Sequence, residues 1–410
     1  MRHPSTLARL IPWAGFAIAL IALPFIFPTR TALVLMNAIG VNAVFALSYN
    51  MLLGQTGMLS FGHAVYYGLG GYAAIHIIAA IKTFALPIPV ALTPLMGFMG
   101  GLAAGAIIGW FSCRRAGTPF AMISLGIGEL VAAAGLMFKA LFGGEEGISG
   151  DRTAGPLLLG LKLTGPGQVY WFIAAWLFIA AFAMWAFTRT PLGRLANAVR
   201  DNPDRVEFIG FDPQRVRYLV FMLAGGFAGL AGGMAAVNYE ILTPESLSAF
   251  PSAAVLIATF IGGVTLFHGP IFGAIFLTLM QSMLSDYTQA WQFYVGGVFV
   301  LIVMFAPTGF AGAIEKGRFK LTYLSWEKLW PRMARAASAG VALALGAVAL
   351  IEMIVRWRNG GRPFALLGIA LPVTSILAWA LTLALIAFGV WMLRLIRKLD
   401  DEEFKGSVAR

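Results

Sequence analysis

RTPLGRLANAVRDNPDRVEFIGFDPQRVR (Arg189–Arg217) is the longest polar interval between the strongly hydrophobic runs of this chain. Pro191 suits a first helical position, and Gly210 with Pro213 closes the segment, which predicts a short helix from about Leu192 to Ile209. The helix would be charged on most sides, so it cannot enter lipid. It can lie at the membrane surface and present its charges to a water-soluble partner. An ordinary cytoplasmic loop, kept inside by its arginines, is the alternative. The interleaved charges are Arg189, Arg194, Arg200, Asp201, Asp204, Arg205, Glu207, Asp212, Arg215 and Arg217.

The rest of the chain is far too hydrophobic for a soluble domain. Hydrophobic residues make up 59% of the whole sequence and charged residues only 11%, against about a quarter charged in soluble proteins. Apolar runs recur at roughly the 20-residue length that crosses a hydrocarbon core of about 30 Å. We therefore expect an all-α polytopic membrane protein. The net charge of +11 fits orientation in a membrane rather than binding of nucleic acid, because the basic residues sit at helix ends and in short loops.

The apolar runs predict about ten core transmembrane helices. The eighth and ninth runs are short, so either can be tilted or re-entrant. In chain order the predicted crossings are Leu10–Phe27, Thr31–Leu53, Leu59–Ile81, Ile88–Ser112, Phe120–Phe142, Val169–Phe187, Tyr218–Asn238, Ser252–Phe267, Ile271–Asp286 and Trp291–Ala306.

Lysine and arginine set the predicted orientation. With the basic N-terminus in the cytoplasm, alternation places Arg114, Arg115 and the Arg189–Arg217 segment inside. The acidic intervals Gly143–Gln168 and Glu240–Glu245 then fall outside. The first apolar run could also belong to a signal peptide, but no small-residue cleavage site follows it, so we expect an uncleaved first helix.

The character of the chain changes after about residue 313. We predict a core at 1–313, a cytoplasmic linker at 314–335, an appended module of two membrane helices at 336–396 and a cytoplasmic tail at 397–410. The module's helices would run from about Ala336 to Val355 and from Phe364 to Ile396, the second kinked at Pro372. Their loop carries three arginines that would face outward against the positive-inside rule: Arg356, Arg358 and Arg362. Such helices are expected to pack on the core or on a neighbour.

Glycines recur every four residues on the fourth and seventh predicted crossings. Small residues at this spacing let helix backbones approach closely in a membrane. The pattern predicts helix–helix seams at Gly97, Gly101, Gly105, Gly109, Gly225, Gly229 and Gly233.

Residues Ala46–Ala74 combine many glycines with polar side chains at membrane depth. Loose backbone is tolerated there only where protein buries it or where it lines a wet cavity. The stretch could therefore line a pathway for a small polar solute, or its histidine and tyrosines could simply be satisfied between helices. The candidate pathway residues are Asn50, Gln55, Ser60, His63, Tyr66 and Tyr67.

Glu129 lies within the fifth predicted crossing, where a carboxylate is costly and hence a functional candidate. Lys139, ten residues on, lies about 80° away on a helical wheel, so the two do not pair within the helix. Glu129 joins the candidate pathway residues. It could titrate, bind a partner helix or cap loosened backbone, and a structural role is the alternative.

Motifs of enzyme chemistry are missing from the sequence. There is no G-x-x-x-x-G-K-[ST], H-E-x-x-H, C-x-x-C or G-x-S-x-G motif. The four histidines are scattered, and Cys113 is the single cysteine, so we expect neither a metal site nor an intrachain disulfide. We expect a transport protein rather than an enzyme.

Four segments resemble the M-type permeases of branched-chain amino acid ABC importers, in the right order over about residues 10–313. They are NMLLGQTGMLSFGHAVYYGLGGY (Asn50–Tyr72), GGEEGIS (Gly143–Ser149), PLGRLANAVRDNPDRVEFIGFDP (Pro191–Pro213) and FIGGVTLFHGPIFGAIF (Phe260–Phe276). The C-terminal pair of helices departs from the usual pattern of that family.

The resemblance implies a bacterial inner-membrane permease that has no cofactor of its own, because partner subunits bind the ATP. Two ATP-binding subunits, a second homologous permease and a periplasmic solute-binding protein would complete the importer. The resemblance also makes Pro191–Pro213 a cytoplasmic coupling helix, with ATPase contacts at Gly193, Arg194, Ala198, Arg200, Asn202, Glu207 and Gly210.

Branched-chain amino acids are the default substrate that this family implies, with urea, short amides and small organic acids as alternatives. Two other classes remain open on the residues themselves. An ion-coupled secondary transporter would use Glu129, His63 and Lys139 as its coupling groups. A passive channel would need no coupling segment.

Overall fold

The structure of the chain is a computed structural model. It describes residues 6–156, 162–288, 290–305, 308–312, 338, 342–343, 345–354, 357, 364–366, 369–371 and 375–408. The chain divides into two compact units, the first made of residues 1–279 with 301–312 and the second of residues 280–300 with 313–410. The predicted core at 1–313 contains the whole first unit together with residues 280–300 of the second.

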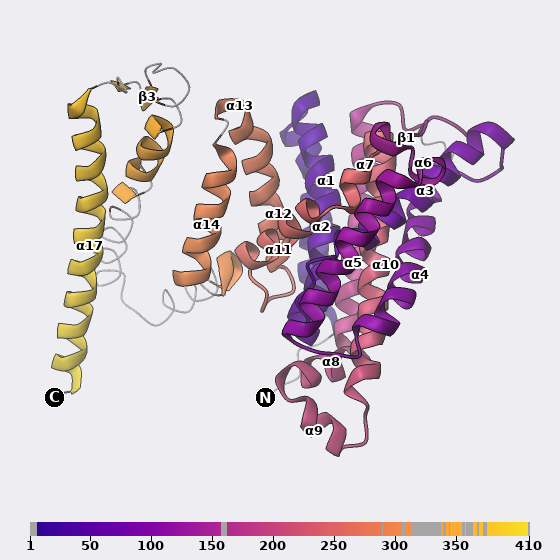
Figure 1. Cartoon of the computed structure of the whole chain (residues 1–410), viewed down its shortest axis with the longest axis horizontal. Helices are drawn as coiled ribbons and strands as arrows, with labels where there is room; N and C mark the ends of the chain where they lie inside the picture. Colours follow the sequence, from indigo (N-terminus) through magenta and orange to yellow (C-terminus); the bar gives the residue numbers. More distant parts are fainter. Residues whose placement is uncertain are drawn as a thin grey trace. The chain divides into compact units, whose positions relative to one another are not determined.

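The first unit is almost entirely helical (Figure 1). Its short 3₁₀ turns are η1 (Val90–Leu92), η2 (Gly144–Glu146) and η3 (Pro244–Leu247). Its helices are α1 (Thr6–Ile26), α2 (Arg30–Thr56), α3 (Ala64–Phe84), α4 (Thr93–Ser112), α5 (Thr118–Met137), α6 (Lys139–Phe142), α7 (Pro166–Arg189), α8 (Pro191–Asp201), α9 (Pro203–Phe208), α10 (Pro213–Tyr239), α11 (Ala249–Gly262) and α12 (Gly269–Leu279).

Six helical segments within the described residues are long and apolar enough to cross a membrane: α2, α3, η1 with α4, α5, α7 and α10. Together with shorter apolar helices they confirm the predicted all-α polytopic membrane fold. Helices α11 and α12, with 14 and 11 residues, correspond to the two short predicted crossings. At 1.5 Å per residue they span only about 21 and 17 Å, which is less than a full hydrocarbon core.

The core of the first unit is built around α10, which packs on α4, α3 and α2. The two predicted glycine seams turn out to face each other, since a Cβ added at Gly97 would lie 2.5 Å from the carbonyl oxygen of Gly229. Gly101 likewise meets Gly225, and Gly233 meets Pro94. The absence of side chains therefore lets the two backbones touch, and dispersion contacts along the seam hold α4 and α10 together.

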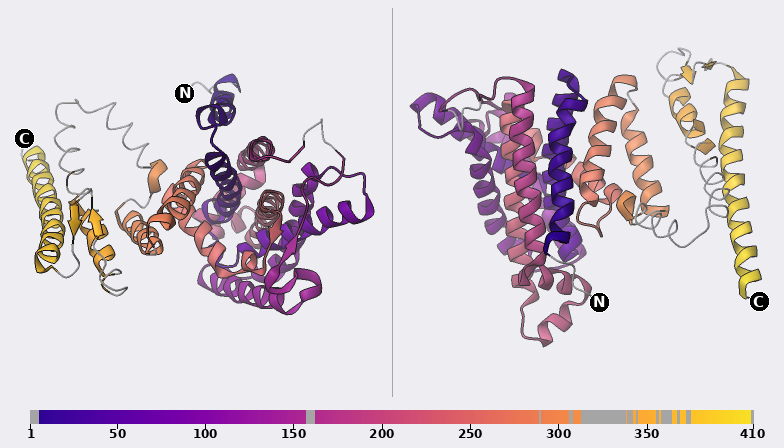
Figure 2. Two further views of the ribbon diagram at one scale, coloured as in Figure 1. Left: turned by 90° about the horizontal axis from the view of Figure 1, so that it is seen from above. Right: turned by 180° about the vertical axis from the view of Figure 1, so that it is seen from behind.

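The first unit has two ends, which we call the α8–α9 end and the β1–β2 end (Figures 1 and 2). Strand β1 (Ile148–Ser149) pairs antiparallel with β2 (Ile241–Leu242), with Ile148 opposite Leu242. The acidic intervals that were predicted to share one side thus meet at one end. Helix α1 begins at the other end, beside α8 and α9. The start of α1 and the α8–α9 segment thus lie at one end and the two acidic intervals at the other, as the predicted alternation requires. Which end faces the cytoplasm stays a prediction.

Several predicted helix limits within the first unit are wrong. The predicted fifth crossing over Phe120–Phe142 ends at Met137, and the separate short helix α6 follows it. The predicted helix from Leu192 to Ile209 is two helices, because Pro203 disfavours the helical conformation at Asn202. The third crossing begins at Ala64 rather than Leu59, since the glycine-rich residues before it form a turn.

The second unit contains a π-helical turn at Met280–Leu284, α13 (Ser285–Tyr287), the first part of α14 (Trp291–Phe305), a helical stretch at residues 345–354, a hairpin of β3 (Phe364–Leu366) and β4 (Ile369–Leu371), and α17 (Ile376–Val408). The predicted single helix over Phe364–Ile396 is wrong at its start, where β3 and β4 pair antiparallel. The predicted tail at 397–410 is helical as far as Val408. The predicted linker at 314–335, Arg356, Arg358, Arg362 and Pro372 lie outside the described residues.

Candidate functional site

Helices α8 and α9 are each started by a capping side chain and a proline that are visible in the sequence. The Thr190 hydroxyl accepts a hydrogen bond from the Gly193 N–H and caps α8, which Pro191 opens. The Asn202 side chain accepts from the Arg205 N–H at 2.9 Å and caps α9. Asn202 is thus both the break between the helices and the start of the second one.

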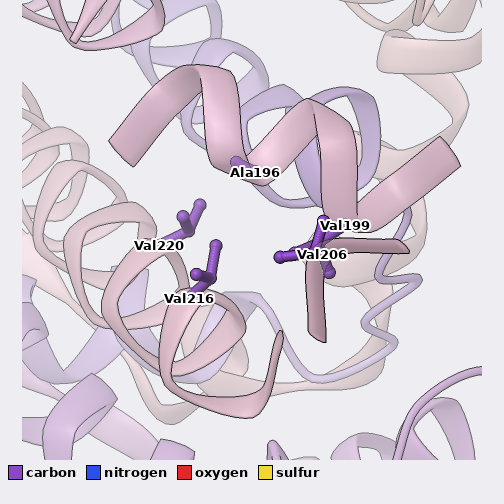
Figure 3. Close-up of a cluster of buried hydrophobic side chains, with 5 residues drawn as sticks. All are labelled: Ala196, Val199, Val206, Val216 and Val220. Atoms are coloured by element: carbon purple, nitrogen blue, oxygen red, sulfur yellow. The ribbon is translucent and has the colours of Figure 1, made fainter. Parts of the chain in front are cut away.

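A cluster of small apolar side chains fastens both helices to the first turns of α10 (Figure 3). Val199 of α8 and Val206 of α9 are each 1% exposed, and they pack with Val216 and Val220 of α10 and with Ala196. Each buried valine contributes roughly 1.5 to 3 kcal/mol of hydrophobic stabilisation. The apolar side of α8 and α9 therefore faces inward and leaves their charged sides free.

Two polar side chains of α8 also point inward, to the C-terminal end of α2. Asn197 Nδ2 donates to Gln55 Oε1 at 2.8 Å, and an Nη of Arg200 donates to the carbonyl oxygen of Gly54. The Arg200 guanidinium also pairs with Asp201, with 2.9 Å between Nη2 and Oδ1. Both partners of the Arg200 guanidinium, the Gly54 carbonyl and the Asp201 carboxylate, thus belong to this chain.

The outer surface of α8 and α9 is charged, with an apolar tip. Phe208 is 91% exposed, Ile209 is 62% exposed and Phe211 is 48% exposed; we call these three side chains the apolar tip. The sequence reasoning missed them, although an F-I-G-F run inside a charged interval was a visible signal. Beside the tip lies a surface hollow of about 630 Å³ whose lining includes Asp204, Glu207 and Asp212. Exposed apolar groups rimmed by charges are typical of protein interaction sites.

The residues predicted to contact an ATPase fall into three settings. Arg194 and Glu207 are exposed on the outer surface, and Ala198 is half-buried. Gly193 and Gly210 serve the backbone: Gly193 abuts the Phe187 carbonyl, and Gly210 has a φ of +88° that favours glycine. The contacts of Asn202 and Arg200 are described above, and the ATPase role of all seven stays a prediction.

The predicted pathway residues on α2 and α3 are packed within the protein. Asn50, Ser60, His63 and Tyr66 are buried, whereas Gln55 and Tyr67 are half-buried. His63 Nε2 lies 3.0 Å from Ser48 Oγ, and the Tyr49 hydroxyl donates to the Ser60 carbonyl at 3.0 Å. The rings of Phe45, Tyr49 and Tyr66 surround the imidazole of His63. In this conformation these residues form a polar core between helices.

Glu129 has a different setting, on the exposed face of α5. Met122 and Leu130, which are 64% and 69% exposed, share that face. Lys139 belongs to the short helix α6, beyond the end of α5 at Met137. Because a carboxylate facing lipid at mid-helix is costly, this face of α5 calls for a protein or water neighbour.

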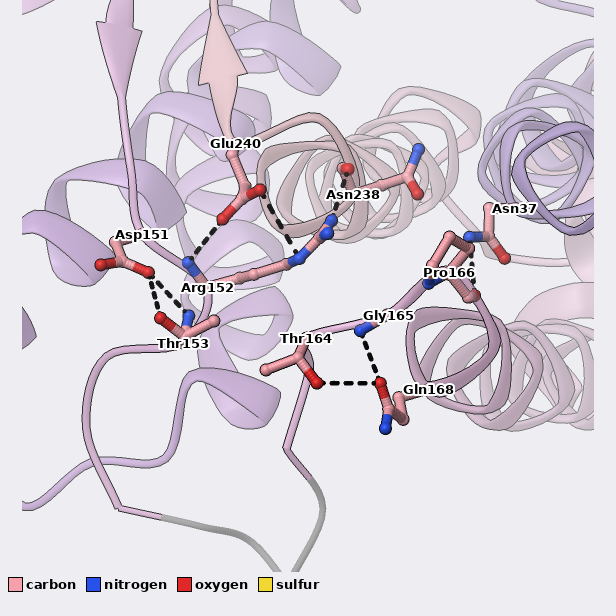
Figure 4. Close-up of polar contacts among 10 residues, drawn as sticks. All are labelled: Asn37, Asp151, Arg152, Thr153, Thr164, Gly165, Pro166, Gln168, Asn238 and Glu240. Carbon is pink, nitrogen blue, oxygen red and sulfur yellow. Dashed lines mark hydrogen bonds and ion pairs between the residues drawn. The ribbon is translucent and has the colours of Figure 1, made fainter. Parts of the chain in front are cut away.

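The β1–β2 end is closed by charges that pair within the chain (Figure 4). The Arg152 N–H donates to Glu240 Oε1 at 3.1 Å, and its guanidinium donates to the Asn238 carbonyl at the C-terminus of α10. Asp151 accepts from the N–H and hydroxyl of Thr153 and pairs with Lys82 at 3.1 Å. These contacts hold the pKa of the Asp151 carboxyl at about 2.

In the described parts of the chain, no three His, Cys, Asp or Glu side chains come together in a way that could hold a metal ion. The single cysteine, Cys113, is buried and free. Two features of the described residues suit an interaction: the outer surface of α8–α9 and the Glu129 face of α5.

Comparison with known proteins identifies the family. The profile of the branched-chain amino acid transport system / permease component matches residues 31–307, well over half of the chain. The chain belongs to this family. The resemblance inferred from the four sequence segments is thereby confirmed, and the α8–α9 segment lies inside the matched region of the permease.

Relatives of this permease are similar over most of its length. The high-affinity branched-chain amino acid transport system permease protein LivM of Escherichia coli (strain K12) is 26% identical over 320 residues, which cover 72% of this chain and 74% of LivM. The corresponding LivH protein of Salmonella typhimurium is 26% identical over 293 residues, 67% of this chain and 92% of LivH. The autoinducer 2 import system permease protein LsrC of Shigella flexneri is 26% identical over 269 residues, 62% of this chain and 73% of LsrC. No solved structure matches the chain.

Proposed function

We propose that this permease is the membrane subunit of an ATP-driven importer for branched-chain amino acids, and that α8 and α9 form its docking surface for an ATP-binding subunit. The observation that carries the proposal is the apolar tip of Phe208, Ile209 and Phe211. Its large apolar side chains lie at a water-exposed end of the bundle, rimmed by the charges of α8 and α9. A large exposed side chain that enters a partner's pocket supplies much of the energy of an interface.

The complete importer would contain two ATP-binding subunits, a second homologous permease and a solute-binding protein. The α8–α9 end would then face the cytoplasm, and the β1–β2 end would receive solute from the periplasm across the inner membrane. The exposed α5 face with Glu129 supports a place for the second permease. A neighbouring subunit, or a water-filled path shared with it, would solvate the carboxylate that lipid cannot.

Branched-chain amino acids are favoured as the substrate by the names of the LivM and LivH relatives. The autoinducer 2 permease among the relatives indicates that the family's substrates vary. Urea, short amides and small organic acids are therefore alternative substrates. The polar core around His63 is compatible with each of these substrates.

The test is uptake by the complete complex in proteoliposomes, with the solute-binding protein added outside and ATP supplied to the ATP-binding subunits. We expect uptake of labelled leucine to require ATP and to survive dissipation of the proton gradient. Competition with urea, short amides and organic acids then ranks the substrates. Uptake that proceeds without ATP would contradict the proposal.

An ion-coupled carrier is the second candidate, and the exposed Glu129 is the observation that favours it. If Glu129 carried a coupling proton, Glu129→Gln would alter the pH dependence of uptake. The importer predicts an unchanged pH profile. Collapse of uptake on dissipating the proton gradient, at constant ATP, would support the carrier.

A further inference from the structure

The loop between α2 and α3, residues 57–63, lies where four helices meet. The Phe61 N–H donates to Ser124 Oγ of α5 at 3.0 Å, and the Ser60 carbonyl accepts from Tyr49 of α2. The N–H of Ala64, which follows the loop, donates to Ser252 Oγ of α11 at 2.9 Å. A shift of this loop therefore pulls on α5 and α11 through named hydrogen bonds.

Helix α8 reaches the same loop from the surface. Asn197 and Arg200 bond to Gln55 and Gly54, the residues directly before it. Gly57, the first residue of the loop, is left-handed with φ of +70°, and a Cβ there would lie 3.0 Å from Cγ of Arg200. The α8 helix and the end of α2 are thus joined by two side-chain hydrogen bonds and a van der Waals contact.

Close packing on the far side leaves the loop little freedom to absorb a displacement. Gly62 lies so near the Ser124 carbonyl of α5 that a Cβ would overlap it, and Gly128 of α5 faces Gly62 as well. A Cβ at Gly54 would lie 2.8 Å from the Val264 carbonyl in the turn after α11. Closely packed interiors transmit strain instead of deforming smoothly.

Three buried polar atoms around the loop have no hydrogen-bond partner in the described part of the chain: Asn50 Oδ1, Ser60 Oγ and His63 Nδ1. An unpaired buried polar atom costs free energy, so this arrangement is less favourable than one that pairs them. A shifted loop can offer them partners. A docked partner that favours the shifted loop could then switch it.

We propose that Asn197 and Arg200 are positioning residues that join α8 to the end of α2, so that a movement imposed on α8 reaches α5 through the loop at 57–63. This inference rests on the proposed ATP-driven function and names the residues that would carry the movement. It gives Arg200 an internal role in addition to any contact with an ATPase.

The test measures ATP hydrolysis and solute uptake separately in the complete reconstituted complex. Asn197→Ala and Arg200→Ala remove the links without touching the apolar tip. In Asn197→Ala, hydrolysis should stay within twofold of the unaltered complex, while uptake falls at least tenfold. Arg200→Ala should lower uptake at least as far. Arg200→Lys keeps one donor toward the Gly54 carbonyl, so its uptake should be at least three times that of Arg200→Ala.

The matched control is Arg215→Ala. Arg215 is also an arginine at the α8–α9 end that pairs with a nearby aspartate, but its side chain is 85% exposed and its ion pair with Asp212 is local. Both rates should stay within twofold of the unaltered complex. Gln55→Ala should match Asn197→Ala, and the double variant should be no worse than either, because the two substitutions remove the same bond.

A cross-link supplies a readout that loss of folding cannot imitate. Gln55→Cys and Asn197→Cys are combined in a Cys113→Ala background and joined with a short bifunctional thiol reagent. Before cross-linking, this variant lacks the hydrogen bond, so its uptake should fall as in Asn197→Ala. The cross-link joins the two positions again and should raise uptake at least threefold. Uptake that stays at the uncross-linked level or falls further on cross-linking would overturn the inference.

The outcomes also separate this inference from the function on which it rests. If the unaltered complex imports solute without ATP, the proposed function fails and the inference fails with it. If the unaltered complex is ATP-driven but hydrolysis and uptake fall together in Asn197→Ala, or neither falls, only the inference is overturned.

Discussion

At the β1–β2 end of the first unit, an arginine and an aspartate bind partners from other parts of the chain, whereas at the α8–α9 end three neighbouring large apolar side chains face outward. Arg152 bridges Glu240 and the C-terminus of α10, and Asp151 pairs with Lys82. Phe208, by contrast, has 91% of its surface exposed. Both ends pair some of their charges within the chain, but the α8–α9 end also keeps an apolar tip whose burial would be favourable.

This difference indicates where a partner can bind tightly. Charges that already have internal partners gain little from a second one, because exposed ion pairs contribute only about 0 to 1 kcal/mol. Apolar surface gains about 25 cal/mol per Å² removed from water. The α8–α9 end is therefore expected to bind the permanent partner, and the β1–β2 end is suited to a transient one.

The largest expected effect is at the apolar tip. Phe208→Asp places a charge where a partner's pocket would exclude water, so affinity for the ATP-binding subunit should fall by about 2 kcal/mol or more, roughly 30-fold. Co-purification of that subunit with the permease measures it. ATP-driven uptake should fall in parallel.

The control for Phe208→Asp is Ile241→Asp at the β1–β2 end, where Ile241 is 46% exposed. It adds the same charge to an exposed apolar residue, and co-purification of the ATP-binding subunit should not change. Equal loss in both variants would mean that the two ends do not differ in partner binding. Unchanged binding in Phe208→Asp would remove the tip from the interface.

The next effect concerns what holds α8 and α9 in place. Val206 is 1% exposed in the cluster with Val199, Val216 and Val220. Val206→Ala should weaken the attachment of α9 by about 1 to 2 kcal/mol, from lost burial and the cavity left behind. Amide hydrogen exchange across residues 191–208 should then accelerate by roughly 10-fold, since 1.4 kcal/mol corresponds to a factor of ten.

Exchange at the β1–β2 end should not change in Val206→Ala, because no contact of the cluster reaches it. Global acceleration would mean that the α8–α9 segment and the remainder of the unit unfold as one. That result would weaken the view of α8–α9 as a separately attached element.

The sequence was informative wherever the deciding interaction is local. Pro191, Gly210 and the 20-residue apolar runs predicted the segment's position and most crossings, because caps, proline and span length act within a few residues. The break at Asn202 was equally local, because Pro203 disfavours the helical conformation of the residue before it, but the prediction overlooked it. The short apolar run at Phe364–Leu371 is ambiguous between helix and strand by periodicity alone, and it formed a hairpin.

Long-range pairing was beyond the sequence. The glycine spacing predicted two seams, but only the fold shows that Gly97 meets Gly229. The candidate site divides in the same way. A charged segment could be predicted, whereas the inward turn of Asn197 toward Gln55, 142 positions away, depends on how α2 and α8 pack.

A smaller effect is expected from the central ion pair of the β1–β2 end. The Arg152 side chain is 18% exposed and lies 3.6 Å from Glu240. Arg152→Ala should lower the stability of the purified permease by about 1 kcal/mol, read as a lower midpoint of thermal unfolding. Binding of the ATP-binding subunit should be unaffected. A loss of that binding would show that the two ends are not independent.

The smallest expected effect is that of Asp151→Asn, and its pH dependence is the informative part. Hydrogen bonds from Thr153, followed by the Lys82 ammonium, lower the pKa of Asp151 to about 2 from the ordinary value of 3.8. A folded-state pKa below the unfolded value stabilises the fold above about pH 4, and this stabilisation is lost as the pH falls toward 2. Because the side chain is partly exposed and Lys82 is mostly exposed, solvent screens the pair and the effect is small.

The difference in unfolding midpoint between the unaltered chain and Asp151→Asn should therefore be constant from pH 8 to pH 5 and shrink only below pH 4. A difference that changes around neutral pH would place the titrating group elsewhere and would contradict the pairing of Asp151 with Thr153 and Lys82.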